Sequence, residues 1–457
     1  MWSSEQVLAL APDAGSIKSG KELATPRKWS STGANEQAAW GECKGSGKEP
    51  YQTQIDLNGP AFKCSCPSRK FPCKHALGLF LLFASQPGLF SQNIPPNWVS
   101  EWLAKRSQRT EQNSKPKVPK EVGAEEKAQK QREAKIHRAA KREERILEGL
   151  EDLELWLQDL VRQGLAAMQA KPLNYWEARA ARLVDAQAPG LARRVREMAS
   201  IPASGEGWQG RLIEAASLIH LAVNGYKNLD SLPQATQEDL RSLVGWTQEQ
   251  DELLKKEGIW DRWLVMGKRV EEETLGALGR STTMKTQRTW LWGESNRQPA
   301  LILSFAAPGQ MLDSSLVPGT VVEAELVYFA GSHPMRALVK QHSIALSSCK
   351  NLPGYTSLSA ATNSYSAALA ANPWIDRFPI ALEGVIPFYT GENWEIRDME
   401  GRSLRLAPGF PLNWQLLALN GGKPMAIFGE WNGECYWPLS VFADERWINL
   451  SVPGFDK

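Results

Sequence analysis

The sequence contains no apolar run approaching the roughly 20 residues needed to span a bilayer. Its first residues also lack the basic segment and the long apolar segment of a secretory signal. The formal net charge is only +2, so any contact with a nucleic acid has to come from a local basic patch. Six cysteines in 457 residues are too few for a disulfide scaffold and fit a reducing compartment. These absences predict a cytoplasmic protein.

The common local signatures of catalysis are also missing from the sequence. It has no Gly-x-Ser-x-Gly elbow, no His-Glu-x-x-His motif and no dinucleotide-binding fingerprint after a strand. Residues 15–22 come close to a phosphate-binding loop, but Glu22 stands where Ser or Thr would bind Mg²⁺ and would repel phosphate. We therefore expect a protein that is not an enzyme. A catalytic site assembled in space by the C-terminal half remains the third alternative.

What the sequence does contain is a tight cluster of metal-binding side chains. Three thiols and one imidazole fall within twelve residues in the order Cys-x-Cys-x6-Cys-x-His: Cys64, Cys66, Cys73 and His75. Such a set completes the tetrahedral coordination that zinc prefers. An alternating segment precedes it at 51–57, and an apolar run follows His75 at 76–83, which predicts strands, a metal loop and a helix in that order.

Other uses of these residues fit the spacing less well. A disulfide between Cys64 and Cys66 would be strained, because side chains one residue apart point to opposite sides of an extended chain. No Cys-x-x-Cys motif supports redox chemistry. A catalytic zinc would need an open coordination position, whereas this motif supplies four protein ligands. We expect one structural Zn²⁺, and we expect Cys43, Cys349 and Cys435 to be buried thiols.

The motif and its flanks resemble the SWIM-type zinc finger, a strand–strand–helix module. The wider stretch 40–75 is similar to bacterial SWIM zinc finger family proteins. This resemblance implies that Cys64, Cys66, Cys73 and His75 are the zinc ligands. It also implies binding to DNA or to proteins, because the family occurs in settings from chromatin remodellers to transposases and ubiquitin ligases. The motif covers less than a tenth of the chain.

Basic residues crowd the predicted metal loop, with one aromatic side chain among them. They either balance the charge of −1 on a zinc ion with three thiolates and a neutral His, or they contact nucleic acid: Lys63, Arg69, Lys70, Phe71 and Lys74. The segment 105–145 adds fourteen Lys or Arg against seven Glu. It could bind phosphates or form a solvated helix or tether, and the interspersed Glu favour the second interpretation.

Beyond this segment the pattern of apolar residues changes twice. From Ile146, apolar residues recur at three- and four-residue spacing and predict a helical bundle. After about Thr282, short apolar segments separated by Gly, Pro and Asn predict strands, including one at 414–419. The sequence thus predicts an α+β multidomain protein with a C-terminal β-rich region that is sandwich-like or barrel-like. The expected parts are a zinc finger domain at 1–104, a basic linker or helix at 105–145, a helical domain at 146–281, and β-rich domains at 282–350 and 351–457.

Two functions of different classes are compatible with this organisation. The first is a non-catalytic adaptor that binds other proteins, stabilised by its zinc module. The alternative is DNA or RNA binding through the metal loop and the basic linker. Near-neutral charge and the mass of the helical and β portions favour the adaptor. We expect neither a membrane nor a small-molecule substrate as a partner.

Overall fold

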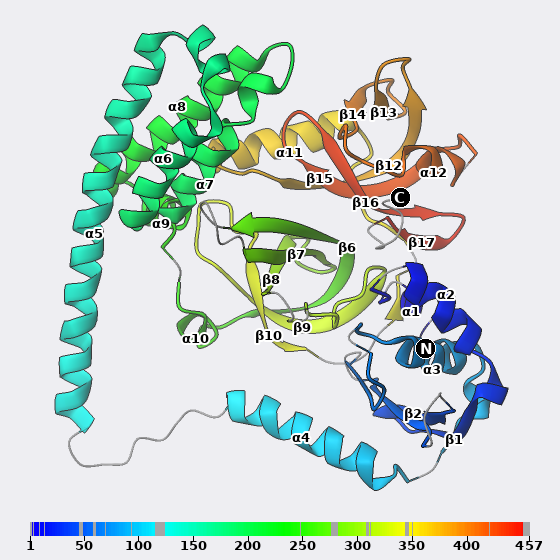
Figure 1. Ribbon diagram of the computed structural model, residues 1–457. Coiled ribbons are helices and arrows are strands. Elements are labelled where there is room, and N and C mark those ends of the chain that lie inside the picture. Colours follow the sequence, from blue (N-terminus) through cyan, green and yellow to red (C-terminus); the bar gives the residue numbers. More distant parts are fainter. Residues whose placement is uncertain are drawn as a thin grey trace.

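A computed structural model describes the chain except for residues 1, 3, 9, 13, 45–48, 58–60, 69, 93, 115–123, 247, 276–281, 308–309, 311, 343–346, 350, 420 and 451–457. Figure 1 shows a small α/β module at the N-terminus, a helical bundle alongside the long helix α5, and two β-rich units. The predicted α+β multidomain fold, with its zinc module, bundle and β-rich C-terminal region, is confirmed.

The N-terminal module is a sheet with helices on both faces. Its strands lie in the order β4-β3-β2-β1-β5, and all neighbours are antiparallel except β1 and β5. Helix α3 packs on one face, and α4 covers the other through Val99, which contacts Trp40. The elements are α1 (Ser4–Leu8), α2 (Ala14–Leu23), η1 (Pro26–Lys28), β1 (Trp29–Ala34), β2 (Ala38–Cys43), β3 (Tyr51–Asp56), β4 (Ala61–Cys64), α3 (Lys74–Ser85), η2 (Pro87–Leu89), β5 (Ser91–Gln92) and α4 (Asn97–Ser114).

Helix α2 contains the segment that came close to a phosphate-binding loop. It is a helix that packs against α3, and glycines on both helices allow the close approach. A Cβ atom on Gly20 would lie 2.9 Å from Leu77 Cβ, and one on Gly78 would lie 2.6 Å from Leu23 Cβ. The glycines of this segment therefore serve helix packing.

Helix α5 runs from the basic segment into the bundle without a break (Figure 1). Four residues of the predicted apolar stripe, Leu150, Leu153, Leu157 and Leu160, are buried in the bundle core together with Ile146. Of the other two residues predicted for this stripe, Leu147 is partly buried and Val161 is 60% exposed. The bundle comprises α5 (Ala124–Gln163), η3 (Leu165–Ala170), α6 (Leu173–Asp185), α7 (Pro189–Met198), η4 (Ile201–Ala203), α8 (Trp208–Lys227), η5 (Leu229–Ser231) and α9 (Gln234–Val244), followed by the short α10 (Gln250–Leu253).

The β-rich region begins earlier than the sequence predicted. Strand β6 (Ile259–Leu275) lies inside the range assigned to the helical domain, and the predicted boundary at 281/282 falls between two paired strands. Trp263 and Val265 are buried on one face of β6, and Leu264 and Met266 are buried on the other. A strand buried on both faces has no polar alternation, so its sequence lacks the usual strand signal.

The second sheet has the strand order β10-β9-β6-β7-β8, with β11 also paired to β9. It curves into a half-barrel (Figure 1), and its two edges approach each other where Leu301 of β8 forms a bridge with Arg336, the residue before β10. Its strands after β6 are β7 (Thr282–Gly293), β8 (Pro299–Ala306), β9 (Thr320–Tyr328), β10 (Ala337–His342) and β11 (Ser347–Ser348).

The third sheet is antiparallel, in the order β14-β13-β12-β15-β16-β17, and two helices pack against it. The prediction of a strand at 414–419 is wrong, because this segment forms helix α12. Leu416 of this helix and Leu412, the residue before it, are buried in the core at a spacing of four residues. The elements are α11 (Leu358–Ala371), β12 (Phe378–Tyr389), β13 (Trp394–Arg397), β14 (Ser403–Arg405), α12 (Asn413–Ala418), β15 (Met425–Trp431), β16 (Tyr436–Ala443) and β17 (Arg446–Asn449).

Specific contacts dock these parts onto one another. Val317, in the loop before β9, belongs to the apolar core of the N-terminal module. The Trp374 indole donates to the Leu218 carbonyl oxygen of α8 at 3.0 Å, which ties the bundle to the third sheet. No helix in the described part of the chain combines the length and the hydropathy needed to cross a membrane.

Candidate metal centre

Two structural elements present the four predicted ligands. Cys64 ends β4, and Cys66 follows a bend held by two hydrogen bonds: Ser65 N to Gln52 O and Gln52 N to Ser65 Oγ, both 3.0 Å. Cys73 is the N-cap of α3, and His75 is the second residue of that helix. The β3–β4 hairpin and the start of α3 therefore bring ligands from both sides of the loop together.

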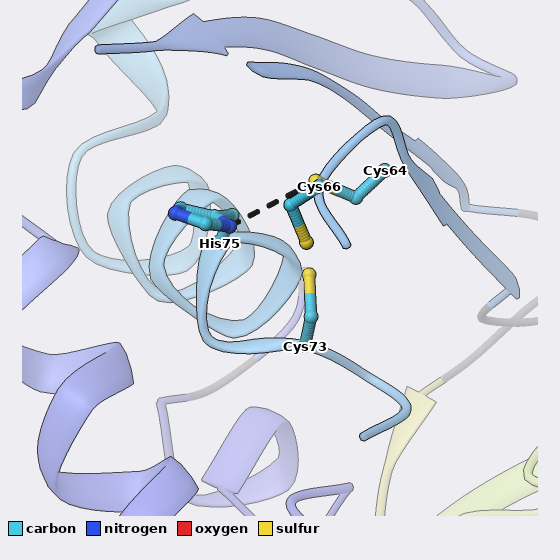
Figure 2. Close-up of side chains that lie close together, drawn as sticks. All are labelled: Cys64, Cys66, Cys73 and His75. Carbon is cyan, nitrogen blue, oxygen red and sulfur yellow. Dashed lines mark hydrogen bonds between the residues drawn. The ribbon is translucent and has the colours of Figure 1, made fainter. Parts of the chain in front are cut away.

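The ligand atoms of Cys64, Cys66, Cys73 and His75 all lie within 4.8 Å of one another. Figure 2 shows the sulfur atoms gathered between the loop and α3, with the His75 ring directed toward Cys64, whose Sγ lies 3.9 Å from His75 Nδ1. A tetrahedral ion with Zn–S bonds of about 2.3 Å places its ligand atoms roughly 3.8 Å apart. The four side chains therefore fit one zinc ion.

Neighbouring groups orient these ligands. The Ala76 backbone N–H donates to Cys73 Sγ at 3.4 Å, which places this sulfur at the N-terminus of α3, where negative charge is favoured. The Thr53 hydroxyl lies 3.2 Å from Cys64 Sγ, and the Tyr51 ring packs 4.9 Å from the His75 ring. These contacts come from β3 and from α3 itself, so the folded module holds the ligands in place.

The three thiols differ in how readily they ionise. The hydrogen bond from Cys73 lowers the pKa of Cys64 to about 4. That same bond raises the pKa of Cys73, and burial raises the pKa of Cys66. Three adjacent thiolates repel one another, and a divalent cation removes this penalty because it deprotonates the thiols that bind it.

One structural zinc ion is the cofactor that this cluster fits, as the sequence predicted. With three sulfurs and one ring nitrogen, the protein fills all four positions of a tetrahedral ion. Cys64, Cys66, Cys73 and His75 would hold the ion, which would cross-link the β3–β4 hairpin to α3. A site of this kind stabilises a fold and leaves no coordination position for a substrate.

The residues predicted to contact nucleic acid surround this centre. Lys63, Lys70 and Lys74 are exposed. Phe71 is 39% exposed and packs edge-on against Phe62, at 5.8 Å between ring centroids. Arg69 lies outside the described residues.

The six cysteines are not disulfide-bonded. Of the three predicted to be buried thiols, Cys43 is buried, whereas Cys349 and Cys435 are only partly buried. Cys349 packs against the core between the second and third sheets, and Cys435 lies in the turn between β15 and β16.

The structure shows two further surface features that were not predicted from the sequence. Three aromatic side chains meet at one end of the third sheet, and a crevice lies between the second and third sheets. The aromatic group had a partial signal, because Tyr389 and Trp394 flank a predicted turn. Its third member, Trp414, lay on a segment mistaken for a strand. The crevice had no signal, since its walls come from strands that are far apart in the sequence.

Comparison with known protein families agrees with this geometry. Residues 51–83 match the SWIM zinc finger, which covers the β3–β4 hairpin, the ligand loop and most of α3. Residues 141–244 match the SWIM-associated four-helix bundle domain, from the middle of α5 to the end of α9. The chain matches no curated protein and no solved structure. The protein therefore carries a SWIM zinc finger and a SWIM-associated helical bundle domain.

Proposed function

We propose that this protein is a non-catalytic adaptor of the cytoplasm, whose zinc centre stabilises the fold and whose C-terminal β region binds another protein. The observation that carries the proposal is a group of three aromatic side chains, two on the third sheet and one on helix α12, which packs against that sheet. We call Tyr389, Trp394 and Trp414 the aromatic platform. The Trp394 ring lies 5.3 Å from Tyr389 and 4.8 Å from Trp414, measured between centroids.

The aromatic platform is well exposed for side chains of this size. Tyr389 is 50% exposed and Trp414 is 67% exposed. Large apolar side chains gathered on a surface mark interaction sites, and Trp and Tyr supply most of the binding free energy in many protein interfaces. A protein partner that covered these rings would remove their apolar surface from water, and this burial would favour binding.

The aromatic platform is also rigid, which favours tight binding. Tyr389 ends β12 and Trp394 begins β13, and these residues are paired in the ladder. Between them, the Thr390 hydroxyl accepts hydrogen bonds from the backbone N–H groups of Glu392 (3.3 Å) and Asn393 (2.9 Å). A preformed surface loses little conformational entropy when a partner binds.

The test is affinity purification of the full-length protein from its native cells after cross-linking, with partners identified by mass spectrometry. The variant is Trp414→Ala. The control is Trp260→Ala, because Trp260 is 56% exposed on β6, in the second sheet. We expect Trp414→Ala to lower the yield of a specific partner at least tenfold, and the control to retain it. The same partners recovered with all three proteins would contradict the proposal.

Nucleic-acid binding is the second candidate, and one observation favours it. Lys63 and Lys74 flank the metal loop, are exposed, and form no ion pair with any described residue. Fluorescence anisotropy with mixed DNA and RNA at two salt concentrations tests this candidate, since phosphate contacts weaken steeply as salt rises. Binding that is lost in Lys63→Gln/Lys74→Gln and at high salt would favour this candidate over the adaptor.

A further inference from the structure

A crevice of about 450 Å³ lies between the second and third sheets. Strands β6 and β7 form one wall, β12 and β15 form the other, and Cys349, Asn351 and the segment 353–355 border it. The volume falls within the range of about 300–1,000 Å³ that is typical of small-molecule sites. The crevice is separate from both the metal centre and the aromatic platform.

The interior of the crevice is apolar. Leu264, Met266 and Leu291 on one wall and Ala381 and Phe428 on the other are all less than 10% exposed because they belong to the packed cores of the sheets, so only a small part of each side chain lines the crevice. Both walls belong to hydrogen-bonded strands, so the space between them is fixed by the packing of the sheets. A ligand that entered would place an apolar body there and release water from its surface.

The polar groups at the mouth of the crevice differ in whether they have a hydrogen-bond partner in the protein. The Glu294 carboxylate pairs with Arg262 at 3.3 Å, and the Glu383 carboxylate accepts the Gly354 N–H at 3.2 Å. By contrast, the guanidinium of Arg297 and the indole N–H of Trp292 have no hydrogen-bond partner among the described residues. Within the described part of the chain, Arg297 and Trp292 are therefore unpartnered donors at a mouth that also holds the exposed Glu383 carboxylate and the Asn351 amide, and the cationic donor Arg297 suits an anionic acceptor.

The turn that carries Arg297 is held in place. Arg297 has a φ of +52°, a left-handed conformation that is uncommon for a residue with a side chain. The buried carboxylate of Asp261 fixes the preceding residues, because Ser295 N and Asn296 N donate to its Oδ2 at 3.1 and 2.9 Å. The backbone of this turn is therefore preformed at the crevice, so that ligand binding requires no rearrangement of the turn itself.

We propose that this inter-sheet crevice binds a small amphipathic anion. The apolar body of the ligand, of the size of one or two aromatic rings, lies between the two sheets. Its carboxylate or sulfonate head accepts hydrogen bonds from Arg297 and Trp292. This ligand-binding site is separate from the aromatic platform, and it is independent of the adaptor function proposed above.

Two fluorescent probes with the same apolar body test the role of charge. The anion 8-anilinonaphthalene-1-sulfonate and the neutral N-phenyl-1-naphthylamine differ only in the sulfonate. We expect the zinc-loaded full-length protein to bind one equivalent of the anion. Arg297→Asn should weaken the anion about tenfold, since a charged hydrogen bond is lost, and should leave the neutral probe unchanged. Asn tolerates the left-handed backbone, so this variant should fold.

Three further measurements complete the test. Arg297→Lys should restore most of the affinity for the anion, whereas Arg405→Gln removes an exposed charge on β14 and should have no effect. Bound anion should slow alkylation of Cys349, which lines the crevice, but not of Cys435, which does not. Equal affinity of wild type and Arg297→Asn for the anion would overturn the proposal. So would unprotected Cys349, or loss of binding in Trp414→Ala.

Discussion

Arg288 of β7 and Glu430 of β15 form a two-bond ion pair that joins the second and third sheets. Arg288 Nε lies 2.8 Å from Glu430 Oε1, and its second nitrogen lies 3.0 Å from Oε2. The indole of Trp290 donates to the same carboxylate at 2.8 Å, and the Glu430 side chain is only 2% exposed. The two β-rich units, predicted as separate domains, thus share a buried polar contact.

Removing Glu430 should destabilise both sheets. Glu430→Ala leaves the Arg288 guanidinium buried without its main partner, a change that costs about 3–5 kcal/mol in comparable buried pairs. Hydrogen exchange measured by mass spectrometry should show faster exchange in β6, β7 and β15 together. The control is Glu272→Ala, because Glu272 pairs with Lys285 on the same sheet but is 58% exposed, and such pairs contribute about 0–1 kcal/mol. Equal effects of the two variants would contradict this account.

The same ion network should make the β region sensitive to acid. Burial opposes the ionisation of Glu271, but the hydrogen bond and the charge of Arg288 outweigh it and lower the pKa of Glu271 to about 2. The pKa of Glu430 is lowered as well, because the same Arg288 outweighs a larger desolvation. Since both carboxyl pKa values are lower in the folded state, the unfolded state binds more protons in acid. The stabilisation is therefore complete above about pH 5 and is lost as the pH falls toward 2.

Urea unfolding between pH 6 and pH 2.5 measures this effect. For Glu271 alone, the shift from 4.5 to about 2 corresponds to roughly 3 kcal/mol. Glu271→Gln should be less stable than wild type at pH 6, and the difference should shrink in acid. If the difference in unfolding free energy between the two proteins stayed constant over this pH range, protonation of Glu271 would not be coupled to unfolding.

Two glycines of the helical bundle should respond in opposite ways to the same substitution. A Cβ atom on Gly190 in α7 would lie 2.0 Å from the carbonyl oxygen of Leu243, whereas one on Gly210 in α8 meets no atom within 4 Å. Gly190→Ala should therefore lower the stability of the bundle by about 1–3 kcal/mol. Gly210→Ala should raise it by up to about 1 kcal/mol, because Ala favours helix. Thermal unfolding followed by circular dichroism measures whether each variant is stabilised or destabilised. A Gly190→Ala variant more stable than wild type would contradict the close contact between Gly190 and Leu243.

The metal centre could be predicted from the sequence because its ligands are local. Cys64, Cys66, Cys73 and His75 lie within twelve residues, so spacing alone defines the ligand set. The helical bundle could be predicted in the same way, since each helix shows its own apolar periodicity. Long-range features had no such signal. Arg288 and Glu430 are 142 residues apart, and nothing in either neighbourhood indicates the other.

The errors in the β region have a common physical cause. Strand β6 is buried between two cores, so its apolar run lacked the alternation that marks a strand. Helix α12 is only six residues long, too short for its helical period to stand out from a strand. In both places tertiary packing, rather than local propensity, determines the structure.

Loss of one metal ligand should unfold the N-terminal module and spare the rest. In His75→Ala the β3–β4 hairpin is no longer cross-linked to α3, and zinc modules of this size depend on roughly 10–16 kcal/mol of metal binding. Hydrogen exchange should rise across β2, β3 and α3, while α6 to α9 keep their protection. The control is Cys435→Ala, which removes a thiol that is not a ligand. Unchanged protection of α3 in His75→Ala would show that the metal is not structural.

The most direct test of the account is the metal itself. Elemental analysis of the full-length protein, purified under reducing conditions without chelators, should give one zinc per chain. X-ray absorption at the zinc edge should show three sulfur ligands at about 2.3 Å and one nitrogen at about 2.0 Å. Less than half an equivalent of zinc, or an oxygen in place of a sulfur, would contradict the assignment of Cys64, Cys66, Cys73 and His75.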